Sequence, residues 1–295
     1  MVLAGAVDPA PLRAAGWSLR GTLSREPYLD RLGAATYVDV DELLEDAAVD
    51  AVAVDGDDSD LGPLLPDLRD SGLLLLLPTA APLDPELVRA ARAVPEPADA
   101  AVGLLGRWAP WATTVAAALP LVGTPAVQVT VRGWPRGRQA AAELVDLAAS
   151  WCGEVVAVVA APAPLPAEAL PGGEAVAWAL LTGSGATVLV SHDGPAPLVR
   201  LSFATARLEA GPDGARWSGG AALPLQPLPA WVPDPTGSPP GLVATAAALA
   251  QAVGGGDVPA ETWPWPADLG DLLVAARVLE ALRTSARTEQ LVPVA

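Results

Sequence analysis

The stretch YVDVDELLEDAAVDAVAV, residues 37–54, decides the fold class of this chain. It opens with an extended pair, Tyr37-Val38, followed by Asp39 and, three residues later, Glu42, a spacing that predicts a capped helix N-terminus. After this helix, the chain enters Ala51–Val54, an uninterrupted apolar run that is typical of a strand buried on both faces. A helix that leads directly into such a strand predicts an α/β fold.

The rest of the first hundred residues repeats this alternation. Leu73–Leu77 is a run of five leucines ended by Pro78, and short apolar runs also occupy Val2–Val7 and Ala101–Leu105. Helices are predicted over 61–71 and from Asp84 to about Ala93, where an aspartate precedes a proline. Strands that alternate with helices imply a parallel sheet, with Ala51–Val54 and Leu73–Leu77 as interior strands.

The second half of the chain has a different pattern, and we expect a separate domain there. Turn signals at 183–185 and at Asp193-Gly194 separate short strands, which indicates a mainly antiparallel sheet. The predicted domains are therefore 1–100 and 101–295, with the closing helix 271–285 packing back on the first. The expected strands are Ala126–Val131, Val155–Val159, Ala175–Leu181, Ala186–Ser191 and Leu198–Arg207, and the expected helices are Trp111–Leu119, Ala140–Trp151, Leu242–Val253 and Asp271–Ser285.

The charge and composition exclude several classes of function. The 295 residues include 17 basic and 34 acidic side chains, for a net charge of −17, which argues against nucleic-acid and anionic-membrane partners. All the basic residues are arginine, so lysine catalysis is excluded. The single histidine (His192) and the single cysteine (Cys152) cannot supply the three or four ligands that a His/Cys zinc site needs. We see no targeting segment and no long apolar run, and we expect a cytoplasmic protein.

Several segments, taken in order, resemble the Gfo/Idh/MocA family of oxidoreductases, the glucose–fructose oxidoreductase and inositol dehydrogenase group. The matching segments are VLAGAVDPAP, the stretch 37–54, LLLLLPTAAPLD, VGLLGRWAPW and VLEALRTSARTEQLVPV. The resemblance implies a Rossmann domain, an α/β domain with a large open sheet, and NAD(P). It places Asp8 where an acidic residue meets the adenosine ribose, and it places Pro78 and Arg107 near the cofactor.

The cofactor-binding features of that family are incomplete here. No G-x-G-x-x-G occurs in the first hundred residues, although such a turn lets the backbone approach the pyrophosphate. If Val2–Val7 is the second Rossmann strand, the first strand is missing. If it is the first strand, the turn is Gly5-Ala6-Val7-Asp8-Pro9, with a carboxylate facing the diphosphate. A further run, Asp55–Asp60, holds four carboxylates that would repel a dinucleotide, and it lacks the spacing of an EF-hand.

The catalytic positions differ as well. Leu77 stands where the family has the lysine of Glu-Lys-Pro, and an apolar side chain cannot shift a proton. Glu143 falls at the position of the family's histidine and Asp146 at that of its aspartate, so the two carboxylates lie on one helical face. They form either an acid–base pair or an ordinary polar face. His192 is interpreted as a turn residue and Cys152 as a buried packing thiol.

Two hypotheses of function follow. In the first, the chain is a degenerate, non-catalytic relative of the family that serves as a structural or regulatory subunit and binds no cofactor as written. In the second, it is an NAD(P)-dependent oxidoreductase acting on a sugar or cyclitol-type alcohol, with the first strand missing from the start of the chain. In either case the apolar residues of the second sheet predict a homodimer, or a heterodimer with a paralogue, through that sheet. The alternative is that the proline-rich segment 221–241, with Trp231, covers the sheet.

Overall fold

The computed structural model describes residues 1–4, 7–23, 35–46, 48–54, 68, 71–78, 100–122, 126–162, 175–194, 196–219, 241–253 and 267–294. The chain divides into two compact units. The first comprises Met1–Leu105 and Pro233–Leu273, and the second comprises Gly106–Val232 and Val274–Ala295.

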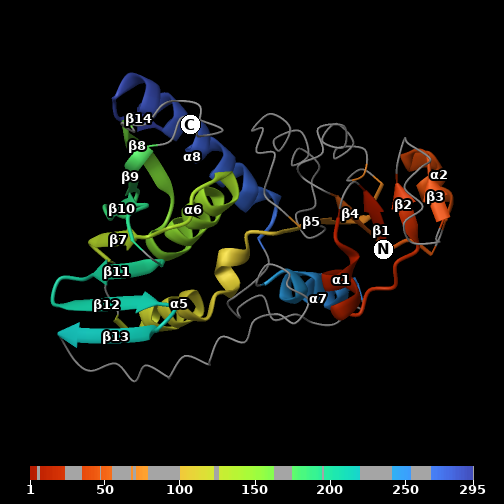
Figure 1. Cartoon of the computed structure of the whole chain (residues 1–295), viewed down its shortest axis with the longest axis horizontal. Coiled ribbons are helices and arrows are strands. Elements are labelled where there is room, and N and C mark those ends of the chain that lie inside the picture. The colour runs from red at the N-terminus through yellow and green to blue at the C-terminus, as the bar shows by residue number, and fades with distance from the viewer. Residues whose placement is uncertain are drawn as a thin grey trace. The chain divides into compact units, whose positions relative to one another are not determined.

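A parallel sheet forms the centre of the first unit. Within the described ranges, six strands lie in the order β3-β2-β1-β4-β5-β6, and each pairs in parallel with its neighbour (Figure 1). This is the strand order of a complete Rossmann sheet. The strands are β1 (Val2–Ala4), β2 (Gly21–Leu23), β3 (Ala35–Tyr37), β4 (Ala51–Val54), β5 (Leu74–Leu77) and β6 (Ala100–Val102). The predicted interior strands β4 and β5 are confirmed.

The position of β1 corrects one prediction. We expected an incomplete Rossmann-like sheet, with the place of the first strand empty or filled by another segment. Instead Val2–Ala4 occupies it, between β2 and β4. The second strand is Gly21–Leu23, which the sequence pattern did not predict because three residues are too few to show a period.

Two helices of the first unit, one early and one late in the chain, pack on this sheet through a small apolar core. Described helices are α1 (Pro9–Ala14), α2 (Val40–Glu45) and α7 (Leu242–Val253). As predicted, Asp39 caps α2, its Oδ1 accepting from the Glu42 N–H at 2.8 Å. Trp17 donates its Nε1–H to the Ala246 carbonyl on α7 at 2.8 Å, which ties that late helix to the first unit. The core cluster is Met1, Leu3, Leu12, Trp17, Ala51, Ala53, Leu76, Ala246 and Leu249.

A mixed, mostly antiparallel sheet forms the second unit. Its eight described strands lie in the order β13-β12-β11-β7-β10-β9-β8-β14, and the β7–β10 pair is parallel. The strands are β7 (Gln128–Arg132), β8 (Val155–Pro162), β9 (Ala175–Thr182), β10 (Thr187–Ser191), β11 (Leu198–Ser202), β12 (Ala206–Gly211), β13 (Gly214–Gly219) and β14 (Val292–Pro293). The expected single strand over 198–207 is in fact β11 and the start of β12, separated by a turn at 203–205.

Figure 1 shows the helices of the second unit on one side of this sheet. They are α5 (Pro110–Val122), α6 (Arg138–Cys152) and the C-terminal part of α8 (Leu269–Thr288), whose Ser285 hydroxyl accepts from the Ala160 N–H. A short 3-10 helix, Leu105–Trp108, precedes α5. The first residues of α8 belong to the first unit, where Asp268 and Asp271 cap each other's backbone N–H. No helix within the described ranges is long and apolar enough to cross a membrane.

Candidate functional site

The turn after β1 is where a Rossmann sheet of this order binds a dinucleotide pyrophosphate. Asp8 is the N-cap of α1, and its Oδ1 accepts from the Ala10 N–H at 2.9 Å. Pro9 and Pro11 occupy the first and third positions of the helix, and neither has an N–H. The first turn of α1 thus presents a carboxylate, and the Ala10 N–H between the two prolines already donates to Asp8. A phosphate-binding turn instead offers free N–H groups. The expectation that Asp8 meets the adenosine ribose assumed that Asp8 follows the second Rossmann strand. In the structure Asp8 follows β1, which is the first strand.

The end of β5 is apolar. Leu77, at the position of the family's lysine, is 3% exposed and pairs in register with Val102 of β6. Its carbonyl accepts from the Gly103 N–H at 2.7 Å. A Cβ on Gly103 would lie 2.1 Å from the Pro78 carbonyl oxygen, so the two segments are in close backbone contact. Leu77 is therefore a core residue, and Pro78 belongs to a tightly packed strand end.

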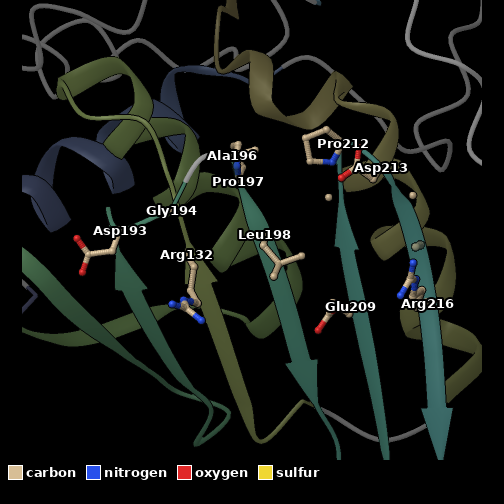
Figure 2. A pocket seen from close by; sticks show the side chains of 13 residues that line it. Arg132, Asp193, Gly194, Ala196, Pro197, Leu198, Glu209, Pro212, Asp213 and Arg216 are labelled. Carbon is tan, nitrogen blue, oxygen red and sulfur yellow. The ribbon is translucent and has the colours of Figure 1, made fainter.

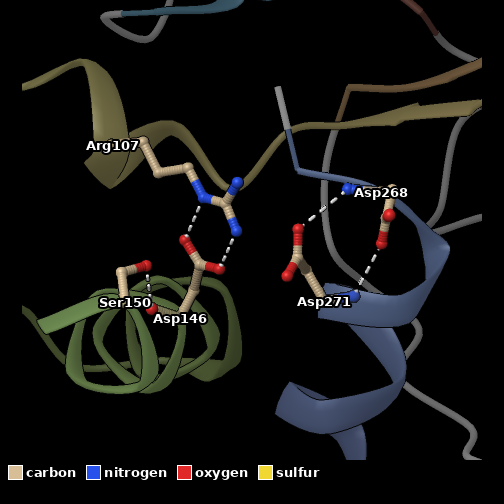
Figure 3. A network of polar contacts seen from close by, with 5 residues as sticks. All are labelled: Arg107, Asp146, Ser150, Asp268 and Asp271. Atoms are coloured by element: carbon tan, nitrogen blue, oxygen red, sulfur yellow. Dashed lines mark hydrogen bonds and ion pairs between the residues drawn. The ribbon is translucent and has the colours of Figure 1, made fainter. Parts of the chain in front are cut away.

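A buried ion pair lies at the start of the second unit. Arg107 donates Nε–H to Asp146 Oδ2 at 2.6 Å and Nη2–H to Asp146 Oδ1 at 2.5 Å (Figure 3). Both side chains are buried, and the Ser150 hydroxyl donates to the Asp146 carbonyl one helical turn later. Arg107, expected near the cofactor by resemblance, thus holds Asp146, and no sequence signal linked two residues 39 positions apart.

Glu143 lies three residues before Asp146 on α6 and is half-buried. Its Oε1 accepts from the Gln139 Nε2–H at 2.8 Å. Gly106 packs against it, since a Cβ there would lie 3.4 Å from the Glu143 Cβ and 3.2 Å from the Leu147 Cδ1. The helix brings the two carboxyl groups to one face, as predicted, but the Asp146 oxygens accept from Arg107. The close contact at Gly106 was not predicted.

The other singled-out residues have local partners. His192 follows β10, and its Nδ1 lies 2.9 Å from the Trp134 carbonyl oxygen. Cys152 ends α6, and its burial raises the pKa of the thiol to about 11. The acidic run Asp55–Asp60 and Trp231 lie outside the described residues. In the parts of the chain that the structure describes, no group of His, Cys, Asp or Glu side chains is arranged to hold a metal ion.

No family model and no curated protein matches the sequence. Solved structures match in fold over 99–100% of this chain and 97–98% of theirs. An oxidoreductase from Agrobacterium radiobacter, in complex with NAD+, L-tartaric acid and magnesium, is 16% identical with a TM-score of 0.68. The WlbA dehydrogenase from Bordetella pertussis, in complex with NADH and UDP-GlcNAcA, is 14% identical with a TM-score of 0.70. An oxidoreductase domain protein from Kribbella flavida is 16% identical with a TM-score of 0.72. The chain therefore has the two-domain Rossmann-like fold of these oxidoreductases.

Proposed function

We propose that this chain is a Gfo/Idh/MocA-like protein that performs no dehydrogenase reaction and serves as a structural or regulatory subunit. The observation that carries the proposal is the first turn of α1. A bound dinucleotide needs N–H donors for its diphosphate, and here two are replaced by proline while the third donates to Asp8. The Asp8 carboxylate adds repulsion, because like charges a few ångströms apart cost about 1 kcal/mol in water and about 4 kcal/mol near a protein surface. The described residues of this turn do not fit an NAD(P) diphosphate.

The second support is the chemistry of the catalytic positions. Oxidation of an alcohol by hydride transfer requires a group that accepts the hydroxyl proton. Leu77 is an apolar core residue, and both oxygens of Asp146 accept from a buried guanidinium. That pairing makes the carboxylate part of the scaffold, because both of its oxygens are already bonded to the guanidinium.

The alternative function is an NAD(P)-dependent oxidoreductase acting on a sugar or cyclitol-type alcohol. The matching structures favour it, since they include levoglucosan dehydrogenase in complex with NADH. The version of this hypothesis in which the first strand is missing is wrong, because β1 is present at the sheet centre. An enzyme built on this chain would need Glu143 as its base and a diphosphate contact outside the first turn of α1.

A subunit role requires a surface for association, and we place it on the open side of the second sheet. Leu189 on β10 and Val159 on β8 are each 37% exposed, although both belong to interior strands. With Ala177 and Ala179 of β9 they line a shallow depression of about 600 Å³. Exposed apolar side chains on a sheet face are typical of an interface, either with a second copy or with a paralogue.

Titration calorimetry with NAD+, NADH, NADP+ and NADPH tests the loss of cofactor binding. We expect no saturable heat for this chain, with levoglucosan dehydrogenase as the positive control for NADH. A micromolar dissociation constant for any of the four would overturn the proposal and favour the enzyme.

A further inference from the structure

The open side of the second sheet has two chemically different halves. Successive side chains on a strand point to opposite faces, so burial separates the residues into two sets. The inward set is apolar and buried, and includes Val129, Val131, Val188, Val190, Val199, Leu201 and Leu208. On β8, β9 and β10 the outward set includes the apolar Val159, Ala177, Ala179 and Leu189, with Thr187 and Ser191 at the two ends of β10. On β7, β11, β12 and β13 the outward set includes Arg132, Arg200, Arg207, Glu209 and Arg216.

The outward side of β7, β11, β12 and β13, which carries these four arginines, is called the arginine half of the face. Such a group of arginines is unusual in so acidic a chain. They are four of its 17 basic residues, placed on four adjacent strands of a protein with a net charge of −17. Arg200 donates Nε–H and Nη2–H to Glu209 Oε2, at 3.0 and 2.6 Å, and so neutralises the carboxylate of this set. Among the described residues, Arg132, Arg207 and Arg216 have no carboxylate within ion-pair distance.

A shallow depression of about 500 Å³ crosses this half of the face. Figure 2 shows Arg132 on one side of it and Arg216 on the other, with Leu198 and Glu209 between them. Asp193 and Asp213 lie at one end of the depression, in the turns that follow β10 and β12. The two guanidinium groups of the lining therefore come from the strands. Of its three carboxylates, Glu209 is paired with Arg200, and those of Asp193 and Asp213 come from the turns at the end of the sheet.

We propose that the arginine half binds a carboxylate-rich segment of a partner protein. Guanidinium groups form charge-assisted, often bidentate hydrogen bonds with carboxylates. Three strand spacings separate β7 from β13, and Arg216 lies two residues along β13 from the position in register with Arg132, so the Cα atoms of the two arginines are about 16 Å apart. In an extended peptide, acidic side chains four residues apart span about 14 Å, and the long side chains of arginine and glutamate cover the difference.

This inference rests on the proposed subunit role and names the chemistry of one partner. A second copy is a poor occupant of the arginine half, because a two-fold interface places the same patch against itself and would bring arginines together. Two-fold pairing over the apolar half is compatible with it, since that half lies on β8–β10.

Fluorescence anisotropy with a labelled oligo-glutamate peptide of about ten residues, at low ionic strength where surface charges are screened least, tests this inference. The wild-type chain should bind the peptide and not an oligo-glutamine peptide of equal length. The double variant R132Q/R216Q should weaken binding at least about tenfold, whereas Arg13→Gln, the same change on an exposed arginine of α1, should leave it unchanged. Thermal unfolding of the double variant should match that of the wild type, because both arginines lie at the surface.

Three results would overturn the inference: no binding of oligo-glutamate, equal weakening by Arg13→Gln, or equally strong binding of oligo-thymidylate, which would indicate an unselective polyanion surface. The proposed function fails separately, by dinucleotide binding in calorimetry. Calorimetry without dinucleotide binding, together with no binding of oligo-glutamate, would remove only the acidic partner.

Discussion

The pair between Arg107 and Asp146 holds the start of the second unit to α6. Both side chains are almost fully buried, so each charge depends on the other for the solvation that it has lost. The opposite case is Arg283 with Glu280 on α8, where both partners are partly exposed. The two pairs allow buried and exposed ion pairs to be compared within one chain.

Breaking the buried pair from one side should be costly. We expect Arg107→Met or Asp146→Asn to lower the free energy of unfolding by about 3–5 kcal/mol, since an unpaired charge or an orphaned donor set remains buried. Arg283→Met should cost less than about 1 kcal/mol. Urea unfolding followed by tryptophan fluorescence measures all three. If the double variant R107M/D146L is no more stable than either single variant, the buried pair is not what makes the single changes costly.

Cys152 should make stability fall in alkaline solution. Burial raises the pKa of its thiol from 9.0 to about 11, so between these values the unfolded chain loses the proton while the folded chain retains it. The stabilisation is thus complete below pH 9 and is lost as the pH rises towards 11. At about 1.4 kcal/mol per pKa unit, the loss reaches about 2–3 kcal/mol. Urea unfolding from pH 8 to pH 11 should show a shallower decline for Cys152→Ala than for the wild type, and parallel curves would refute the assignment.

At the scale of the element, the contact between the ends of β5 and β6 depends on a glycine. Gly103 approaches the Pro78 carbonyl so closely that any Cβ would overlap backbone atoms, which cannot move aside as a side chain can. Gly183, in the turn after β9, has no atom nearer than 3.7 Å to the same position.

We therefore expect Gly103→Ala to lower the free energy of unfolding by about 4 kcal/mol or more, which is exceptional for one methyl group. Gly183→Ala is the matched control and should change it by less than about 1 kcal/mol. Thermal and urea unfolding measure both variants. A soluble Gly103→Ala protein of wild-type stability would mean that the two strand ends separate easily.

Residue patterns were sufficient for the longer elements and insufficient for the shortest ones. The Asp39 cap, the run Ala51–Val54 and helix 242–253 were predicted because each combines a local signal with enough residues to show it. Strand β2 has three residues, and its place is set by pairing with β1 and β3. The sequence singled out Leu77, but it did not predict the partners of Asp146 and Gly103, because these contacts join residues far apart in the sequence.

At the scale of the whole molecule, the exposed apolar half of the second sheet predicts self-association. We expect sedimentation equilibrium at tens of micromolar to give twice the 29.8 kDa mass of the chain. Leu189→Glu should shift the protein towards the monomer, since it places a charge among Val159, Ala177 and Ala179. Leu44→Glu, on an exposed leucine of α2, should not. A wild-type monomer at these concentrations would refute the homodimer. The heterodimer is refuted if a paralogue added to the same experiment does not bind.

The order of strands in the second sheet also has a consequence for how the chain refolds. Strand β7 comes first in this sheet's sequence but lies at its middle, pairing through Val129 with Val188 and through Val131 with Val199. On one side of it β11, β12 and β13 follow one another through short turns, and on the other side β9 and β10 do so, and these strands can form as local hairpins. Because distant pairings are slow to form, β7 should insert after these hairpins and join two half-sheets. Until it does, each half-sheet has an unpaired edge, so this step is where a refolding chain is most prone to aggregate.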